Sequence, residues 1–221
     1  MIQNDAMSLV DSVIETYRHL KTYRDAGLVS AWNERTRTDD MFSTQFLSPQ
    51  RFRFDYLSSH PDPELSGEAI YHGIVLNELG VFSYIRHFDS KGNMTEVRSI
   101  GDAVARLAGV SFGAVHMIAR LLLDEVPGMS LRDFVGFRLA EDLVVSGIPC
   151  KHVHCSTPMG QSVLAIESAS LLIRRVTHNN PKFQCEESRS EVSINGDIDE
   201  KVFVEPFVES LRWSDESSQP A

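Results

Sequence analysis

The most constraining stretch of this 221-residue chain runs from Asp40 to Ser58, DMFSTQFLSPQRFRFDYLS. Aromatic or threonine side chains take every second position on both sides of a Ser48-Pro49-Gln50 turn: Phe42, Thr44 and Phe46, then Phe52, Phe54 and Tyr56. Arg51, Arg53 and Asp55 alternate with the last three. A period of two with aromatic residues predicts two antiparallel strands, each with one buried face.

The same two-residue period recurs before and after a central segment of different character. Strands are expected at residues 28–37, 40–48, 51–58, 68–76 and 81–88, and again at 137–145, 150–156, 162–167, 171–178 and 183–194. Short turns between consecutive strands favour an antiparallel meander. Because the composition does not shift along the chain, we expect one domain over residues 1–208, followed by a polar, Ser-rich tail at 209–221 that is disordered.

Two segments have a helical period instead. Residues 8–22 predict an amphipathic N-terminal helix, with apolar residues on one face: Val10, Val13, Ile14, Tyr17 and Leu20. In the central segment Ser99 is a helix start and Gly109 a helix stop, and a second helix is expected at about 111–123. That helix is apolar nearly all round, which is typical of a buried helix. The predicted fold is therefore α+β: a strongly curved, antiparallel half-barrel of about 10–11 strands whose concave face is covered by helices.

Composition excludes several classes of function. A formal net charge of −10 and a pI near 5.2 argue against non-specific nucleic-acid binding and against docking on anionic lipid head groups. The chain contains no run of 18 apolar residues, so no transmembrane helix is predicted. The first 20 residues lack the pattern of a signal peptide. Either the chain is cytosolic or it is a mature chain whose leader has been removed.

The candidate catalytic and metal-binding groups are few. Cys150, His152 and His154 would share one face of a strand, where they could ligate zinc, but no second ligand pair accompanies them. His116 lies in the apolar helix, where it is either a buried general base or a hydrogen-bonding neighbour. Since no Gly-x-Ser-x-Gly motif and no phosphate-binding loop is present, we expect no catalytic residue, no metal and no cofactor.

The aromatic and apolar side chains allow two interpretations. They are either an ordinary sheet core packed on helices, or the lining of a hydrophobic ligand cavity that a curled sheet encloses. On the second interpretation the central helices fill the cavity until an acyl chain displaces them. The candidate ligand-binding residues are Trp32, Phe42, Phe46, Phe52, Phe54, Tyr56, Phe82, Tyr84, Val115, Ile118 and Leu122.

A series of short motifs carries a family resemblance. In chain order they are YRDAG at 23–27, Phe42-x-Thr44-x-Phe46, Pro49-x-Arg51-Phe52-Arg53-Phe54, Leu107-x-GVSFGA to residue 114, LLL at 121–123, GIPC at 147–150, VLAIE at 163–167, Leu171 with Arg174-Arg175, and a last group from Ile194-Asn195 through Ile198-Asp199 and Phe203 to Pro206. In this order they resemble the lipoprotein-carrier-like superfamily of LolA/LolB type, and within it a branch of predicted periplasmic proteins. The resemblance spans residues 10–206.

The resemblance implies an eleven-stranded, unclosed barrel with helices over its mouth, lipid or acyl chains bound inside, and a periplasmic location. One departure limits it. Carriers that shuttle lipoproteins have an arginine immediately before the proline of the second strand turn, and Ser48 stands there in this chain. The shuttling cycle of those carriers is therefore not expected for this chain. A lipid-anchored receptor is not expected either, because there is no lipobox cysteine near the N-terminus.

Three functional hypotheses remain open. The first is a non-enzymatic carrier whose partner is a hydrophobic small molecule or lipid, with no nucleic acid and no membrane span. The second is a cytoplasmic enzyme of the same fold, for which the superfamily offers a violacein-pathway precedent that acts on an aromatic intermediate. Its candidate residues are Arg51, Arg53, His72 and His116. The third is an interaction module with a filled core.

Overall fold

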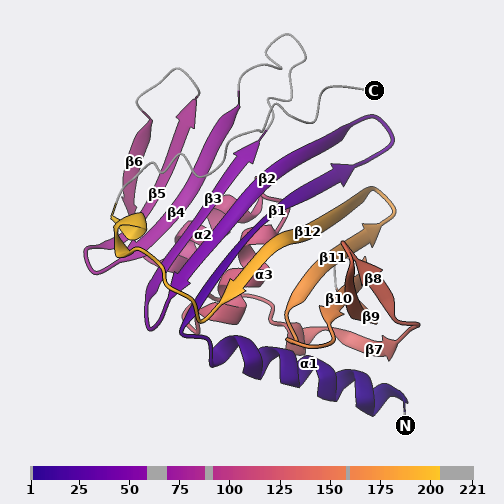
Figure 1. Ribbon diagram of the computed structural model, residues 1–221. Helices are drawn as coiled ribbons and strands as arrows, with labels where there is room; N and C mark the ends of the chain where they lie inside the picture. Colours follow the sequence, from indigo (N-terminus) through magenta and orange to yellow (C-terminus); the bar gives the residue numbers. More distant parts are fainter. Residues whose placement is uncertain (1, 59–68, 88–91, 158–159, 205–221) are drawn as a thin grey trace, which may run out of the picture.

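The computed structural model describes residues 2–58, 69–87, 92–157 and 160–204. In this part of the chain one twelve-stranded antiparallel sheet curls around two central helices, and a third helix lies across the lower strand ends (Figure 1). The strand order is β6-β5-β4-β3-β2-β1-β12-β11-β10-β9-β7, with β8 also paired to β9. Because the end strands β6 and β7 do not pair, the barrel is unclosed.

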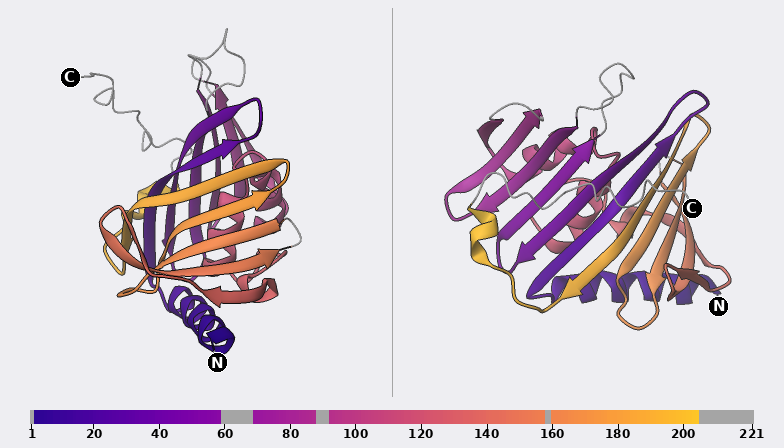
Figure 2. Two further views of the ribbon diagram at one scale, coloured as in Figure 1. Left: turned by 90° about the vertical axis from the view of Figure 1, so that its right-hand side faces the viewer. Right: turned by 45° about the horizontal axis from the view of Figure 1, so that its top comes forward.

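The curvature separates the sheet into two differently oriented halves (Figure 2). The helices are α1 (Ile2–Arg18), α2 (Ile100–Ala108) and α3 (Ala114–Leu122), with short 3-10 turns η2 (Leu131–Asp133) and η3 (Glu200–Phe203). The first half of the sheet contains β1 (Thr22–Trp32), β2 (Arg37–Leu47), β3 (Arg51–Ser58), β4 (Ile70–Asn77), β5 (Gly80–His87) and β6 (Asn93–Val97). The second contains β7 (Val135–Leu139), β8 (Leu143–Val145), β9 (Ile148–Thr157), β10 (Gly160–Glu167), β11 (Ile173–Asn180) and β12 (Phe183–Ile194).

The predicted α+β half-barrel is confirmed, with differences in its details. The expected strand at 137–145 is two strands, β7 and β8, and β6 was not predicted at all. The expected N-terminal helix reaches only Arg18, so β1 starts at Thr22, where a helix had been expected. In β1 burial alternates from Tyr23 onward, but the buried set includes Asp25, and this hid the period from a count of apolar residues.

Gly27 allows β1 to lie close to the backbone of β12 and to the Phe42 ring. The pairing of β1 with β12 shifts register between Ala26 and Gly27, which marks a bulge. A Cβ atom at Gly27 would lie 2.0 Å from the carbonyl oxygen of Ser188 and 2.6 Å from Cζ of Phe42. Only glycine therefore fits at this position of β1, between the Ser188 carbonyl of β12 and the Phe42 ring of β2.

The central helices follow the predicted signals closely. The Ser99 hydroxyl accepts a hydrogen bond from the backbone N–H of Asp102 at 3.1 Å, which caps α2 as expected. Gly109 directly follows the last residue of α2, which confirms the predicted helix stop, and its φ of −66° is right-handed. The left-handed residues are instead Phe112 and Gly113, with φ of 51° and 91°, which turn the chain into α3.

The core lies between the concave face of the sheet and these helices. Register places Phe42 opposite Tyr56 and Phe46 opposite Phe52, so the aromatic residues of β2 and β3 share this face, as predicted. Phe54 stacks on Phe42 with ring centroids 5.9 Å apart. Val115 and Ile118 of α3 belong to the same buried cluster. Stacked aromatic rings and apolar helices thus fill the space over β2 and β3.

The outer face of the sheet holds a buried ion pair under η3. Arg53 is fully buried and donates two hydrogen bonds to the Asp55 carboxylate, at 2.7 and 2.8 Å. It also donates to the carbonyl of Val202 at 2.8 Å, while Asn77 donates to the carbonyl of Phe203 at 2.7 Å. These bonds hold η3 against β3 and β4. The expected domain end at 208 and the tail at 209–221 lie outside the described residues.

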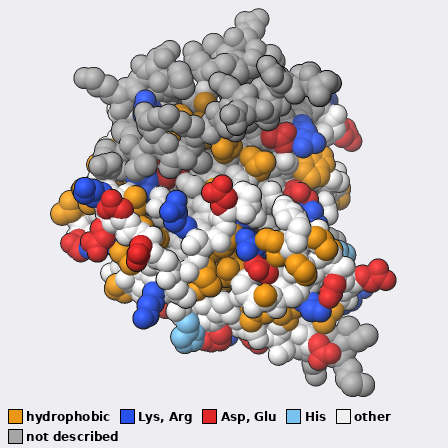
Figure 3. Space-filling model, viewed as in Figure 1, with side chains coloured by type: hydrophobic (Ala, Val, Ile, Leu, Met, Phe, Trp, Pro, Cys, Tyr) orange, Lys and Arg blue, Asp and Glu red, His pale blue; other side chains and the backbone are white. Residues whose placement is uncertain are grey.

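The remaining outer surface is mixed in character. Figure 3 shows acidic and basic side chains interspersed, with hydrophobic groups scattered between them. Among the described residues, no helix combines the length and apolar character that crossing a bilayer requires.

Candidate functional site

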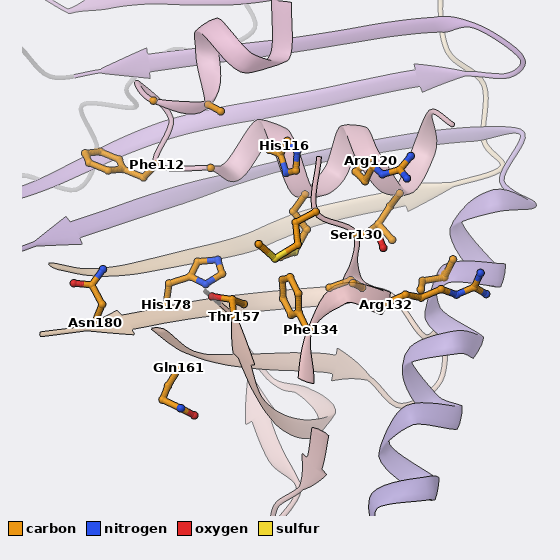
Figure 4. A pocket seen from close by; sticks show the side chains of 18 of the residues that line it. Phe112, His116, Arg120, Ser130, Arg132, Phe134, Thr157, Gln161, His178 and Asn180 are labelled. Carbon is orange, nitrogen blue, oxygen red and sulfur yellow. The ribbon is translucent and has the colours of Figure 1, made fainter. Parts of the chain in front are cut away.

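A cavity of about 630 Å³ lies between α3, the end of α1 and the adjacent ends of β9–β12 (Figure 4). It is thus in the half of the molecule away from the aromatic residues of β2 and β3. Its apolar lining residues are Ile14, Ala108, Phe112, Met117, Leu121, Met129, Leu131, Phe134 and Phe183. Its polar lining residues include Arg18, His116, Arg120, Ser130, Arg132, Thr157, Gln161, His178 and Asn180.

Flexible and aromatic side chains form the middle of this cavity. Met117 of α3 and Met129 of the following loop contribute thioethers, which adapt to irregular apolar shapes. Phe134 also lines the cavity and is drawn near Thr157 in Figure 4. Phe112 stacks on Phe183 with ring centroids 5.4 Å apart and so joins the α2–α3 turn to β12. The walls therefore suit an elongated apolar group.

Three arginines line the end of the cavity that faces α1. Arg18 lies 3.6 Å from the carboxylate of Glu15. Arg120 donates from Nη1 to the backbone carbonyl of Asp124 at 3.0 Å. Arg132 donates from Nε to the carboxylate of Asp11 at 3.1 Å. Each guanidinium thus uses only some of its N–H donors in these contacts.

The two histidines of the lining are held by different partners. His116 Nε2 lies 3.1 Å from the carbonyl oxygen of Pro127, so the N–H at that position donates to the loop after α3. His178 Nδ1 lies 2.7 Å from the hydroxyl of Ser162 on the neighbouring strand. Burial lowers the pKa of His178, so its imidazole is neutral at neutral pH.

The lowered pKa of His178 predicts a pH-dependent stability. Near the ordinary imidazole pKa of about 6.5 the unfolded chain binds more protons than the folded chain, so the free energy of unfolding falls as the pH drops. We expect His178→Gln to lose less stability than the wild type between pH 7.5 and pH 5.5 in urea denaturation. The control is His19→Gln, at an exposed histidine. It should lose as much stability as the wild type between pH 7.5 and pH 5.5. Equal pH slopes for His178→Gln and the wild type would contradict the assignment.

Solved structures share this architecture at low sequence identity. LppX, a lipoprotein of Mycobacterium tuberculosis, matches with a TM-score of 0.51 and 11% identity, over 89% of this chain and 98% of its own. The chain has a LolA-like fold. LprF of Mycobacterium bovis matches with a TM-score of 0.49 and 8% identity over 89% of this chain and 95% of its own. A LolA superfamily protein of Nitrosomonas europaea matches with a TM-score of 0.30 and 10% identity over 90% and 96%.

Comparison of the sequence alone gives no further assignment, since no family model and no curated protein matches it. The LolA-like fold is nevertheless the one that the sequence motifs predicted. It has twelve strands in the described residues, where the resemblance implied eleven.

The eleven predicted ligand-binding residues are distributed over three places in the LolA-like fold. Seven are buried in the core between the concave face of the sheet and the central helices: Phe42, Phe46, Phe52, Phe54, Val115, Ile118 and Leu122. Tyr56 is also buried on that face and donates to the Asp40 carboxylate at 2.7 Å. Trp32, at the end of β1, donates to the side chain of Gln184 at 2.7 Å. None of the eleven is among the residues that line the 630 Å³ cavity.

Phe82 and Tyr84 lie on the other face of the sheet from Phe54. Register pairs Tyr84 with Gly73 and Gly73 with Asp55, whose neighbour Phe54 points to the helices. The Tyr84 hydroxyl bonds to Asp55 and to Arg53. Tyr84 also borders a second cavity, of about 560 Å³, between β4–β6 and α2.

The three residues considered for zinc differ in their surroundings. Cys150 is buried with Val145 and Ala165, and no group of three potential metal ligands occurs among the residues described. His152 and His154 lie side by side with ring centroids 4.6 Å apart. The three cysteines are free and buried.

The candidate residues of the enzyme hypothesis do not meet at one site. Arg51 pairs with Glu78 and Glu200, while Arg53 is buried under η3. His72 lines the second cavity and His116 the first. Of the four, His116 alone lines the 630 Å³ cavity.

Sequence reasoning missed nearly all of that cavity. Its lining comes from α1, α2, α3, the segment at 129–134 and four strands, so no local period reveals it. One signal was available: Arg120 interrupts an otherwise apolar helix, and a cation at such a position either reaches solvent or faces a polar site.

Proposed function

We propose that this chain is a non-enzymatic binding protein that holds an acyl-chain ligand in the 630 Å³ cavity. The observation that carries the proposal is the cavity itself, which has apolar walls and convergent polar groups at its ends. Its volume lies within the range of about 300–1,000 Å³ that small-molecule sites occupy. Burial of ten methylene groups would contribute roughly 8 kcal/mol before the cost of ordering the chain.

The LolA-like fold supports the proposal by analogy only. LppX is a lipoprotein by its own description, and a periplasmic location for this chain is part of the proposal. The concave aromatic core stays a second proposed site. Phe54 and its neighbours would meet a ligand only if α3 moved off the sheet, because they are fully buried against the helices.

Filling the cavity is expected to weaken ligand binding. Met117→Trp places a larger, rigid side chain on the cavity wall, and we expect the Kd for a fluorescent fatty acid to rise at least about tenfold, which is about 1.4 kcal/mol. Val144→Trp on β8 is the matched control, since Val144 is exposed and outside the lining. Fluorescence titration measures both variants.

The outcomes separate the hypotheses. Wild-type protein that takes up no fatty acid and carries no ligand in native mass spectrometry would overturn the proposal in favour of a filled interaction module. Uptake that Met117→Trp leaves unchanged would place the ligand elsewhere. Thermal unfolding of each variant confirms that a loss of binding does not reflect a loss of folding.

A further inference from the structure

We infer that the ligand carries an anionic head group, a carboxylate or a phosphate ester, which binds at the α1 end of the cavity. The inference rests on the proposed function and deepens it. In a chain of net charge −10, the cavity lining contains three arginines and neither aspartate nor glutamate. A random sample of this surface would be acidic, so the lining selects against cations and favours anions.

The three arginines come from separate segments and meet at one end. Arg18 ends α1, Arg120 lies in the last turn of α3, and Arg132 belongs to η2. Figure 4 shows Arg120, Ser130 and Arg132 at the end of the cavity near α1. Convergence of guanidinium groups from three elements onto one place is a geometry that suits a carboxylate or phosphate.

Arg120 has donor capacity that the protein does not use. Its Nε atom is shielded from solvent and has no hydrogen-bond partner among the described residues. Its one hydrogen bond in the described part of the chain comes from Nη1, so an anionic oxygen in the cavity would find terminal N–H groups of this guanidinium without a protein partner. Arg132 uses only its Nε toward Asp11, which leaves its terminal N–H groups for a ligand.

The neighbouring carboxylates orient these arginines from outside the lining. Glu15 and Asp124 flank Arg18 at 3.6 and 3.9 Å, and Asp11 contacts Arg132. Since these pairs are well exposed, solvent screens them. They offset part of the positive charge, so recognition depends on directed N–H donors more than on net charge.

The rest of the cavity fixes the direction of the ligand. Asn180 and Gln161 lie at the end opposite the arginines in Figure 4, and both are uncharged. The lining also includes Met117, Met129 and Phe134, whose side chains offer apolar contact to a ligand that spans the two ends. An acyl chain would therefore extend from the arginine end across the thioethers toward the amides.

The test compares ligands with one chain and different heads. Oleate, oleoyl lysophosphatidate and oleyl alcohol compete with a bound fluorescent acyl probe at low ionic strength. We expect at least one of the two anions to bind about tenfold or more tightly than the alcohol, and the tighter anion identifies the head group. Arg120→Gln should reduce this preference to about threefold or less while the alcohol keeps its affinity.

Controls keep this result distinct from a failure of the proposed function. Arg98→Gln removes the same charge at a side chain that is 92% exposed and outside the lining, and it should keep the preference. Arg132→Gln tests the same head-group site at an exposed ion pair, if loss of the Asp124 contact destabilises Arg120→Gln. Equal affinity of all three ligands would overturn the inference and keep the acyl-binding proposal, whereas failure of all three to bind would overturn both.

Discussion

Replacement of Arg189 by methionine is expected to lower the free energy of unfolding by about 3–5 kcal/mol. Arg189 is on β12 and only 2% exposed. Its Nε donates to the Asp25 carboxylate at 2.8 Å, and its other side contacts the Glu187 carboxylate. Methionine has a similar length but no charge, so both carboxylates would stay buried without a cation.

The contacts around Arg189 join β12 to β1 and β2, and a neighbouring hydrogen bond joins α1 to β11. Tyr23 donates to Asp25 at 2.6 Å, and the Tyr17 hydroxyl accepts from the backbone N–H of Ile173 at 3.2 Å, which links α1 to β11. The guanidinium also lies over the Phe42 ring, 5.4 Å from its centroid. Burial raises the pKa of Glu187, and the positive charge of Arg189 opposes that rise. Loss of Arg189 would therefore favour the protonated form of Glu187.

Urea denaturation with Arg37→Met as the control measures this effect. Arg37 also pairs with an aspartate, Asp39 at 3.1 Å, but its side chain is 67% exposed, so its loss should change little. Glu187→Gln added to Arg189→Met should recover part of the lost stability, because it removes one of the two stranded charges. Similar losses for the Arg189 and Arg37 variants would show that the buried network does not stabilise the fold.

The sequence predicts a strand correctly where apolar residues take every second position without interruption. The alternation from Phe42 to Tyr56 predicted β2, β3 and their turn, because each position that faces the helices there is aromatic or threonine. β1 was missed in its first half because the position between Tyr23 and Gly27 is a buried aspartate. That carboxylate is buried only because Arg189, 164 residues away, neutralises it. The local sequence pattern therefore cannot show that Asp25 is buried, because the residue that pairs with it is so distant in the sequence.

The cavity was unpredictable for a related reason. Phe134, His178 and Arg18 lie more than 40 residues apart in sequence, and only the curl of β9–β12 toward α3 brings them together. The sequence did predict a curled sheet with helices on its concave side. It could not show that the space over β2 and β3 is filled while space remains beside β9–β12, since that depends on side-chain volumes across the interface.

Phe54→Ala is expected to lower the free energy of unfolding by about 3–5 kcal/mol. Phe54 is fully buried, with rings of Phe42 and Tyr56 stacked on either side at centroid distances of 5.9 and 6.5 Å. Its removal deletes both stacking contacts and leaves a cavity that rigid strands cannot fill. Phe82→Ala is the matched control, because Phe82 is only partly buried and lies on the opposite face of the sheet, so its loss should cost less.

Ligand affinity in the same variant distinguishes the two proposed sites. If an acyl chain occupies the space beside β9–β12, Phe54→Ala destabilises the protein and leaves the Kd for the fluorescent fatty acid unchanged. If instead the chain enters beneath a displaced α3, the variant both loosens the helix and enlarges the room for a ligand, so the Kd falls or the stoichiometry rises. Met117→Trp should have the converse effect on the first site, since it blocks the cavity and changes no aromatic side chain of β2 or β3. Unchanged affinity in Phe54→Ala with weakened affinity in Met117→Trp would therefore assign the ligand to the cavity and the aromatic residues to the support of the fold.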